Sequence, residues 1–476
     1  MLFNSIEFVF FFILVTVAYF ILPQRFRWFL LLAASCYFYM AFVPIYILIL
    51  GFTIVIDYFA GILIENEQGN RRKLYLVMSL IANIGVLAVF KYYNFLNQNL
   101  TALLGSFSAN NPIPFLKILL PIGLSFHTFQ AMSYTIEVYR GNQKAERHFG
   151  IYSLYVMFYP QLVAGPIERP QNLLHQFREK FDFDYGRVVE GLKLILWGLF
   201  KKIVIADRLA IYVNAVFNNV DHHNGTTLIL ATFFFAFQIY CDFSGYSEIA
   251  IGAARVMGFN LMTNFNRPYF SRNISEFWKR WHISLSTWFK DYLYISLGGS
   301  KVSIPRWYFN LFFVFLVSGL WHGANWTFII WGAINGFYLI FAIITQSLRS
   351  NFDKITGLSR LPKLNYAIQI LLTFMLTSFA WIFFRANNLP DAVLIIKKIF
   401  TQRGPLFFEA PSMLIFPFLG ILMLLVVEIK KEYYNHKFSL FNNDKWIVRH
   451  LSYAILVILI LLMGVFDGGQ FIYFQF

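Results

Sequence analysis

Apolar runs recur along the whole chain, and they constrain its fold more than any other feature. A helix needs about 20 mostly apolar residues to cross the hydrocarbon core of a bilayer. Some of the runs are short enough to be partial or re-entrant spans, so we expect roughly 11 to 13 membrane-embedded helices. The runs lie near residues 5–22, 28–43, 45–64, 74–92, 116–138, 150–165, 188–206, 227–241, 308–320, 325–347, 366–385, 412–429 and 450–466.

The composition agrees with a bilayer as the main solvent of this chain. Only 13% of the residues are charged, whereas a soluble domain has roughly 25%. Aromatic residues make up 20%, including 58 Phe, and lipid tolerates that much aromatic surface better than water does. The first eight residues contain no Lys or Arg, so we expect the first apolar run to remain as a span rather than to be a cleaved signal peptide. A single all-α, membrane-embedded domain over residues 1–476 is the simplest prediction, and the chain shows no repeat or linker that divides it.

The formal net charge of +15 is better explained by topology than by nucleic-acid binding. Basic residues gather in short clusters between the apolar runs, as the positive-inside rule expects beside anionic lipid. The clusters include Arg25 and Arg27, the run from Arg71 to Lys73, and several residues between 430 and 449. If all three face the cytoplasm, both ends of the chain lie outside. The two cysteines, Cys36 and Cys241, have no partner at metal-ligand spacing, so we expect neither a zinc site nor a disulfide framework.

The segment 265–300 departs from this pattern because it is basic, aromatic and too charged to face lipid. Asn273 followed three residues later by Glu276 predicts a capping box and a helix that starts there. On one continuous helix Trp278, His282 and Ser286 would share a face. We therefore expect an amphipathic or re-entrant helix at the membrane interface.

His322 is the strongest candidate for chemistry. It lies in an otherwise apolar stretch among the small residues Ser318, Gly319, Gly323 and Ala324, which would allow close approach of backbone or substrate. Ionisable groups inside membranes are rare and usually face a cavity or the bundle interior, and imidazole suits proton transfer near neutral pH. A structural histidine bonded between helices explains the local pattern equally well.

Two other histidines are weaker candidates on their own context. His282 has Trp neighbours in the basic segment, where an interfacial histidine satisfied by water is the simpler explanation. For His127 a structural hydrogen bond is the simpler one. The buried charges around Lys201, Asp207 and Asp242 predict either ion pairs that hold helices in register or a polar funnel for substrate.

Five motifs together resemble the membrane-bound O-acyltransferase (MBOAT) family. They follow the family's order between about residues 120 and 325, and the similarity is greatest to its bacterial branch, which includes the alginate O-acetyltransferase membrane subunit. The residues near the end, from Gly464 to Phe476, also resemble the polysaccharide-acetylating group. The motifs are PIGLSFHTFQ (121–130), YPQLVAGPI (159–167), YCDFSGY (240–246), FWKRWHISL (277–285) and SGLWHG (318–323).

The resemblance implies a helical membrane enzyme with a central funnel or tunnel. His322 matches the family's near-invariant histidine, and His282 matches its second polar position. The implied acyl donor is a cytoplasmic thioester on coenzyme A or an acyl-carrier protein, and the acceptor is a hydroxyl. A general base would activate that hydroxyl. The residues that we expect to bind substrate are Trp278, Lys279, Arg280, Trp281, Asp242, Ser244, Trp321 and Asn325.

The leading hypothesis is an O-acyltransferase, with acetyl as the expected group, that serves a cell-envelope or extracellular polysaccharide. Its expected partners are the thioester donor, membrane lipids and an acyltransferase at the outer face, in the inner membrane of a bacterial cell. One alternative is D-alanyl transfer to teichoic acids. A transporter or channel is another, because buried charges and a funnel also serve conduction.

Overall fold

The computed structural model is all-helical in the residues that it describes. These are residues 1–476 except 118–119, 164, 435–442, 444, 467–470 and 473–476. Within them, eight helical segments are long and apolar enough to cross a membrane, so the chain is a polytopic membrane protein, as its apolar runs predict. The eight are Pro44–Asn66, Gly69–Ser106, Gly225–Met257, Ile304–His322, Trp326–Ile344, Pro362–Arg385, Ser412–Tyr433 and Trp446–Met463.

The other five predicted runs form helices that are too short or too polar to qualify as full spans. The first of them, α1 (Ile6–Ile21), is apolar but has only 16 residues. The run 150–165 is divided between α7 (Phe149–Met157) and α8 (Tyr159–Leu162). The described residues thus contain eight helices long and apolar enough to span a membrane, fewer than the 11 to 13 membrane-embedded helices that the sequence predicts.

The described chain forms two compact units. Unit 1 contains Met1–Ile195 and Tyr246–Met262, and unit 2 contains Leu196–Gly245 and Thr263–Phe476. Two boundaries between them fall inside helices, in α10 (Tyr185–Leu199) and in the 33-residue α12 (Gly225–Met257), and the third follows α12, between Met262 and Thr263. A single membrane-embedded domain stays a prediction.

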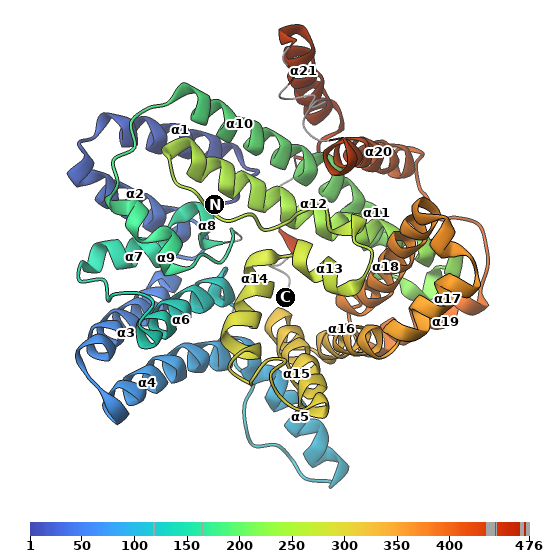
Figure 1. Cartoon of the computed structure of the whole chain (residues 1–476), viewed down its shortest axis with the longest axis horizontal. Helices are drawn as coiled ribbons and strands as arrows, with labels where there is room; N and C mark the ends of the chain where they lie inside the picture. The colour runs from blue at the N-terminus through green and yellow to red at the C-terminus, as the bar shows by residue number, and fades with distance from the viewer. Residues whose placement is uncertain (118–119, 164, 435–442, 444, 467–470, 473–476) are drawn as a thin grey trace. The chain divides into compact units, whose positions relative to one another are not determined.

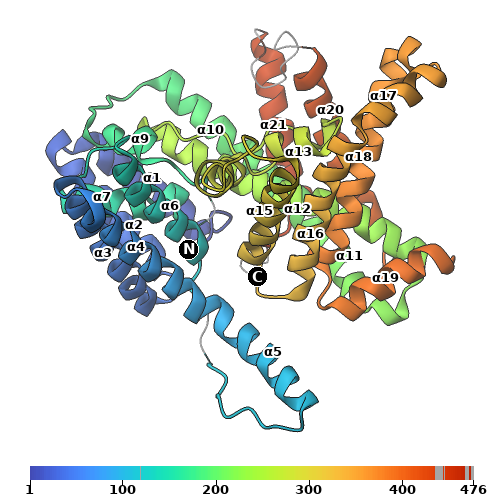
Figure 2. The ribbon, with the colours of Figure 1, turned by 60° about the horizontal axis from the view of Figure 1, so that its bottom comes forward.

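Unit 1 is built on helices that pack as close neighbours early in the chain. α3 (Ile47–Asn66) lies against both α4 (Gly69–Leu87) and α6 (Leu124–Arg140) (Figure 1). α5 follows α4 and extends away from the other helices of this unit (Figure 2). The further helices of unit 1 are α2 (Gln24–Met40), α5 (Tyr93–Ser106) and α9 (Pro170–Leu173).

Unit 2 holds the segment that the sequence marks as basic and aromatic, together with His322. Its buried core is rich in aromatic rings from several helices, including Trp281, Trp331 and Trp381. Its helices are α11 (Asp207–Phe217), α13 (Ile274–Arg280), α14 (Ile283–Trp288), α15 (Ile304–His322), α16 (Trp326–Ile344), α17 (Gln346–Ile355), α18 (Pro362–Arg385), α19 (Leu389–Thr401), α20 (Ser412–Tyr433) and α21 (Trp446–Met463).

Candidate active site

His322 is the last residue of α15, at the tip of a tight hairpin with α16. The two helices run side by side (Figure 2). They approach closely because glycines face each other: a Cβ at Gly319 would lie 2.3 Å from the Phe328 carbonyl oxygen, and one at Gly332 would lie 2.3 Å from that of Phe315. The small residues around His322 therefore allow close backbone packing, as predicted.

The cap of α16 fixes the turn that follows His322. The side chain of Asn325 accepts a hydrogen bond from the Thr327 N–H, and its amide donates to the Asn387 carbonyl oxygen at 3.4 Å. Such an N-cap satisfies one of the donors that a helix leaves free at its start. This contact gives Asn325, a predicted substrate-binding residue, a structural task at the hairpin turn.

The imidazole of His322 is enclosed by aromatic rings. The side chain is only 4% exposed. Its ring centroid lies 5.0 Å from those of Trp321 and Trp331 and 5.3 Å from that of Phe384. Trp331 and Phe384 meet the imidazole edge-on, at 85° and 71°. This surround excludes bulk water from a group that can accept or donate a proton.

The predicted helix through His282 is interrupted, so the expectation of one continuous face is wrong. α13 ends at Arg280 and α14 starts at Ile283, and His282 between them has a left-handed backbone with φ +42°. Trp278 and Ser286 therefore belong to different helices. The start of α13 is as predicted, because the Asn273 side chain accepts a 2.9 Å hydrogen bond from the Glu276 N–H.

Asn264 holds this break from 18 residues earlier in the chain. Its backbone carbonyl accepts the Ile283 N–H at 2.8 Å, and its side-chain oxygen accepts both the N–H and the hydroxyl of Ser284, at 3.2 and 2.9 Å. Asn264 is fully buried, so these bonds are shielded from water. The backbone of His282 is thus set by a contact far away in sequence.

His282 and His322 approach the same tryptophan from two directions. The imidazole of His282 lies 6.1 Å from Trp321, whose ring is 5.0 Å from His322. Phe243 of α12 packs edge-on against His282 at 4.5 Å. Burial lowers the pKa of His282 to about 3, so this imidazole is neutral near pH 7 and can act as an N–H donor.

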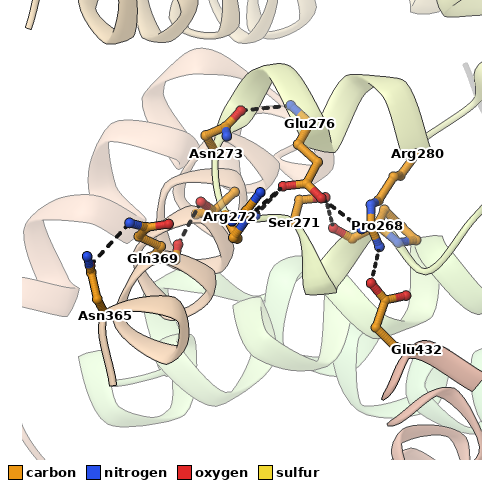
Figure 3. A network of polar contacts seen from close by, with 10 residues as sticks. Pro268, Ser271, Arg272, Asn273, Glu276, Arg280, Asn365, Gln369 and Glu432 are labelled. Atoms are coloured by element: carbon orange, nitrogen blue, oxygen red, sulfur yellow. Dashed lines mark hydrogen bonds and ion pairs between the residues drawn. The ribbon is translucent and has the colours of Figure 1, made fainter. Parts of the chain in front are cut away.

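A network of ion pairs fixes α13 in place (Figure 3). Arg280 contacts Glu276 of its own helix at 2.7 Å and Glu432 of α20 at 2.8 Å. Arg267 reaches the same Glu432 at 2.6 Å. Glu276 also accepts the N–H of Arg272, the residue before the Asn273 cap, at 2.9 Å. Arg280, predicted to meet the donor, is thus engaged by two carboxylates.

A cavity of about 390 Å³ lies between the α13–α14 segment and the α15–α16 hairpin. Its wall is mostly apolar and includes Trp278, whose ring also packs 5.7 Å from Trp331. Ser318, one helical turn before His322 on α15, lines it as well. Lys279 and Lys290 are both exposed and both line this cavity, so two ammonium groups stand beside an apolar chamber.

Trp281 belongs to the packed core of unit 2. Its side chain is 1% exposed, and its ring lies 5.0 Å from Trp381 and 5.2 Å from Phe265. It does not line the cavity. Of the predicted aromatic contacts, Trp278 is the one in the cavity wall, whereas Trp321 joins the two histidines.

Asp242 belongs to a buried ion cluster rather than to the cavity wall. Its Oδ1 lies 2.6 Å from the ammonium of Lys202, which also contacts Asp207 at 2.8 Å. Its Oδ2 accepts the Ile472 N–H at 2.7 Å. Ser244 accepts a 3.3 Å hydrogen bond from Lys201. These contacts agree with ion pairs that hold helices in register.

The match to known proteins decides the family. The model of the membrane-bound O-acyltransferase family matches residues 147–385, about half of the chain. A Pseudomonas aeruginosa protein named "Probable alginate O-acetylase AlgI" is 38% identical over 84% of this chain and 75% of its own length. The chain belongs to the MBOAT family. It is therefore a membrane-bound acyltransferase.

Two other relatives show the range of named activities. A Helicobacter pylori protein named "Peptidoglycan O-acetyltransferase" is 36% identical over 85% of this chain and 80% of its own length. A Streptococcus thermophilus "Teichoic acid D-alanyltransferase" is 30% identical over 55% of this chain and 68% of its own length. The similarity to the two O-acetylating proteins thus covers more of the chain.

The MBOAT match contains every predicted catalytic and substrate-binding residue except the weaker candidate His127, and unit 2 holds them all. Sequence reasoning missed Asn264 and Glu432, which position the His282 segment, and did not single out Lys202 as the ion in the cluster's centre. The sequence does contain a signal for Lys202, because two adjacent lysines, Lys201 and Lys202, lie close to Asp207 in an apolar stretch. His127 lies in unit 1, where it is 1% exposed on α6 and its ring is 6.5 Å from Tyr39.

Proposed function

We propose that this MBOAT member transfers an acetyl group from a cytoplasmic thioester to a hydroxyl, with His322 as the general base. The observation that carries the proposal is one buried imidazole in an aromatic surround, beside a cavity with ammonium groups at its wall. The reaction serves the O-acetylation of a cell-envelope or extracellular polysaccharide, in the inner membrane of a bacterial cell.

The chemistry follows from the two imidazoles. His322 takes the proton of the acceptor hydroxyl as its oxygen attacks the thioester carbonyl carbon. The carbonyl oxygen becomes an oxyanion, and the C–S bond then breaks while His322 returns the proton to the leaving thiolate. His282, neutral because burial lowers its pKa, donates an N–H to the oxyanion. Exclusion of water by the aromatic surround limits hydrolysis of the thioester.

The cavity beside α13 and α14 is our proposed seat for the donor. Coenzyme A and an acyl-carrier protein both present an arm with anionic phosphate, which ammonium groups attract. The volume of about 390 Å³ lies in the range of small-molecule sites. Lys279 and Lys290 bind the phosphate, and the apolar wall with Trp278 receives the acyl end. Trp278 of the cavity wall packs 5.7 Å from Trp331, whose ring lies 5.0 Å from His322, so aromatic contacts connect the cavity wall to the imidazole.

The acceptor side is proposed from the names of the relatives. Alginate and peptidoglycan, named in two of them, both carry hydroxyls on a polysaccharide outside the cytoplasm. A donor on the cytoplasmic side and an acceptor outside require transfer across the membrane. We propose that an acyltransferase at the outer face receives the acetyl group and passes it to the polymer.

The test is replacement of His322 in living cells. His322→Ala and His322→Gln are expressed at matched membrane levels, and ester-linked acetate is released from envelope polymers by mild alkali and measured. Loss of a general base lowers the rate by about 10²–10⁴-fold, so the acetate falls to background. His222→Ala, at an exposed loop position of unit 2, is the matched control and retains acetylation.

Two other outcomes of the His322 replacement would change the proposal, and they can be told apart. Near-normal acetate in both His322 variants contradicts the role of this residue. Ester-linked D-alanine in place of acetate, lost in the same variants, identifies the second candidate activity, which the teichoic acid relative favours.

A further inference from the structure

A carboxyl group lies near the middle of a membrane span in unit 1, apart from the catalytic chemistry. Asp57 of α3 belongs to the span Pro44–Asn66 and is completely buried. Within the described part of the chain, its contacts are the Ser79 hydroxyl at 2.5 Å and the Asn83 amide at 3.0 and 2.9 Å. Both partners are neutral. A carboxylate there would be a buried charge without a counter-ion, which is costly inside a membrane.

The number of protons that the hydrogen bonds around Asp57 require indicates whether its carboxyl group is ionised. Ser79 Oγ touches Asp57 Oδ1 at 2.5 Å and Thr135 Oγ1 at 3.2 Å, and Thr135 Oγ1 lies 3.2 Å from the Met132 carbonyl oxygen. These three contacts need three protons, but two hydroxyls supply only two. The third is available if Asp57 is a carboxylic acid that donates to Ser79. Ser79 then donates to Thr135, and Thr135 donates to Met132.

Asn83 makes a metal ion an unsuitable occupant. Its Nδ2 also donates to the Ser79 carbonyl oxygen at 3.0 Å, which fixes the orientation of the amide. The other N–H is therefore shared between the two oxygens of Asp57, where it would repel a cation. The O···O contact to Ser79, at 2.5 Å, lies within the range of ordinary O–H···O hydrogen bonds.

Among the described residues, two further polar atoms in this buried region have no hydrogen-bond partner. The side-chain oxygen of Asn83 and the hydroxyl of Tyr152 are both in this state, and both residues are completely buried. Tyr152, on α7, is a titratable neighbour, and a phenol is ordinarily uncharged near pH 7. α4 and α6 contribute the uncharged Ser79, Asn83 and Thr135.

We propose that Asp57 is an intramembrane proton-binding site, held as a neutral carboxylic acid at the head of the Ser79–Thr135 hydrogen-bond chain. α3, α4 and α6 meet at this point, and Tyr134 of α6 packs where a Cβ at Gly61 of α3 would lie 2.6 Å from its ring. Loss of the proton leaves a bare charge in this tight contact, so protonation and helix packing are linked. The site is independent of acyl transfer.

The first test is labelling of the full chain in its membrane with dicyclohexylcarbodiimide, which reacts with protonated carboxyls in apolar surroundings. Peptide mass spectrometry is expected to find the adduct on Asp57 at neutral pH, with less adduct as pH rises. Protection by sodium chloride, but not by choline chloride, would mean that the site binds sodium and would overturn the proton assignment.

The second test does not depend on access of the reagent. Infrared spectra of the wild type are expected to contain the carbonyl band of a carboxylic acid that Asp57→Asn lacks. Asp57→Asn keeps the shape and neutrality of the acid, so its unfolding temperature stays near that of the wild type. Asp207→Asn is the matched control, because it removes a buried carboxylate that pairs with Lys202, and its unfolding temperature falls clearly.

An absent acid band, or equal destabilisation by the two substitutions, shows that Asp57 is ionised and contradicts the proposal.

Discussion

The backbone of His282 adopts a conformation that residues other than glycine ordinarily avoid. Its φ of +42° lies in the left-handed region, where a side chain with a Cβ costs about 1–2 kcal/mol. The Asn264 contacts offset that cost by satisfying the N–H groups that follow. Strained backbone often occurs at functional sites. We therefore infer that this conformation serves to position the imidazole, which lies 6.1 Å from Trp321.

Two substitutions separate the imidazole from the backbone at this position. His282→Gly removes both the ring and the strain, whereas His282→Ala removes the ring and keeps the strain. We expect both variants to lower turnover at saturating donor to a similar extent, because both lack the N–H donor. The free energy of unfolding, measured by thermal unfolding, is expected to be up to about 1 kcal/mol higher for His282→Gly than for His282→Ala.

A different result for His282→Gly and His282→Ala would contradict the catalytic role of the imidazole. If activity follows unfolding temperature, so that His282→Gly is nearly as active as wild type, the imidazole positions the fold and does not assist the reaction. Asn264→Ala completes the set, because it keeps the imidazole and loosens the turn that holds it.

At the scale of residues, the sequence predicts which residues are candidates for the site better than it predicts the contacts that fix their conformation. An apolar run with one histidine among small residues, together with a motif of known order, is enough to single out His322. The break at His282 depends on Asn264, a partner distant in the chain, and no Gly or Pro marks it. Local patterns of propensity contain no information about such a contact.

At the scale of elements, the α13–α14 segment divides its basic residues between two tasks. Arg280 and Arg267 hold the segment to Glu432, whereas Lys279 and Lys290 line the cavity. Sequence composition predicts a basic surface but treats these residues alike. Only the position of α20 distinguishes them, and that position is a tertiary property.

Charge reversal at the cavity tests this division. Lys279→Glu with Lys290→Glu is expected to raise the apparent KM for the thioester donor with little change in kcat, because the anionic donor loses attraction but not its reaction geometry. The difference from wild type should shrink at high salt, which screens exposed charges. Steady-state kinetics in membranes or detergent provide the measurement.

Two further variants control that experiment. Lys363→Glu reverses an exposed lysine at the start of α18 and leaves the KM unchanged. Arg280→Glu places a third carboxylate beside Glu276 and Glu432, so it lowers the amount of folded protein instead. An unchanged donor KM in the double lysine variant, with less protein in the membrane, would mean that these lysines anchor the segment to anionic lipid.

At the scale of the whole molecule, hydropathy predicts the class of fold and most of the spans. All eight segments long enough to cross a membrane coincide with predicted runs. Hydropathy overstates the full spans where buried helices are short, as in α7 and α8, because an apolar helix inside protein resembles one inside lipid. The division into two units has no signal in composition, and two of its three boundaries fall inside continuous helices.

Orientation across the membrane is the last prediction, and it rests on the basic clusters between spans. We expect Arg71 to Lys73 and the basic residues between 430 and 445 to face the cytoplasm, and both ends of the chain to face outside. Arg72 is a poor reporter, because its guanidinium donates to the Val138 and Tyr139 carbonyl oxygens. The side chain of Arg71 is 76% exposed, so Arg71→Cys should leave the fold intact.

The measurement uses a background in which Cys36, half-buried, and Cys241, buried, are replaced by Ser and Ala. A maleimide that cannot cross the membrane is added to intact cells and, separately, to inside-out vesicles. Arg71→Cys is expected to react only in the vesicles. Ile6→Cys, at the exposed first residue of α1, is expected to react only in intact cells. Reaction of Arg71→Cys from outside intact cells would invert the topology. The positive-inside rule also places the other basic clusters in the cytoplasm. An inverted topology would therefore contradict the proposal that the thioester donor enters from the cytoplasmic side.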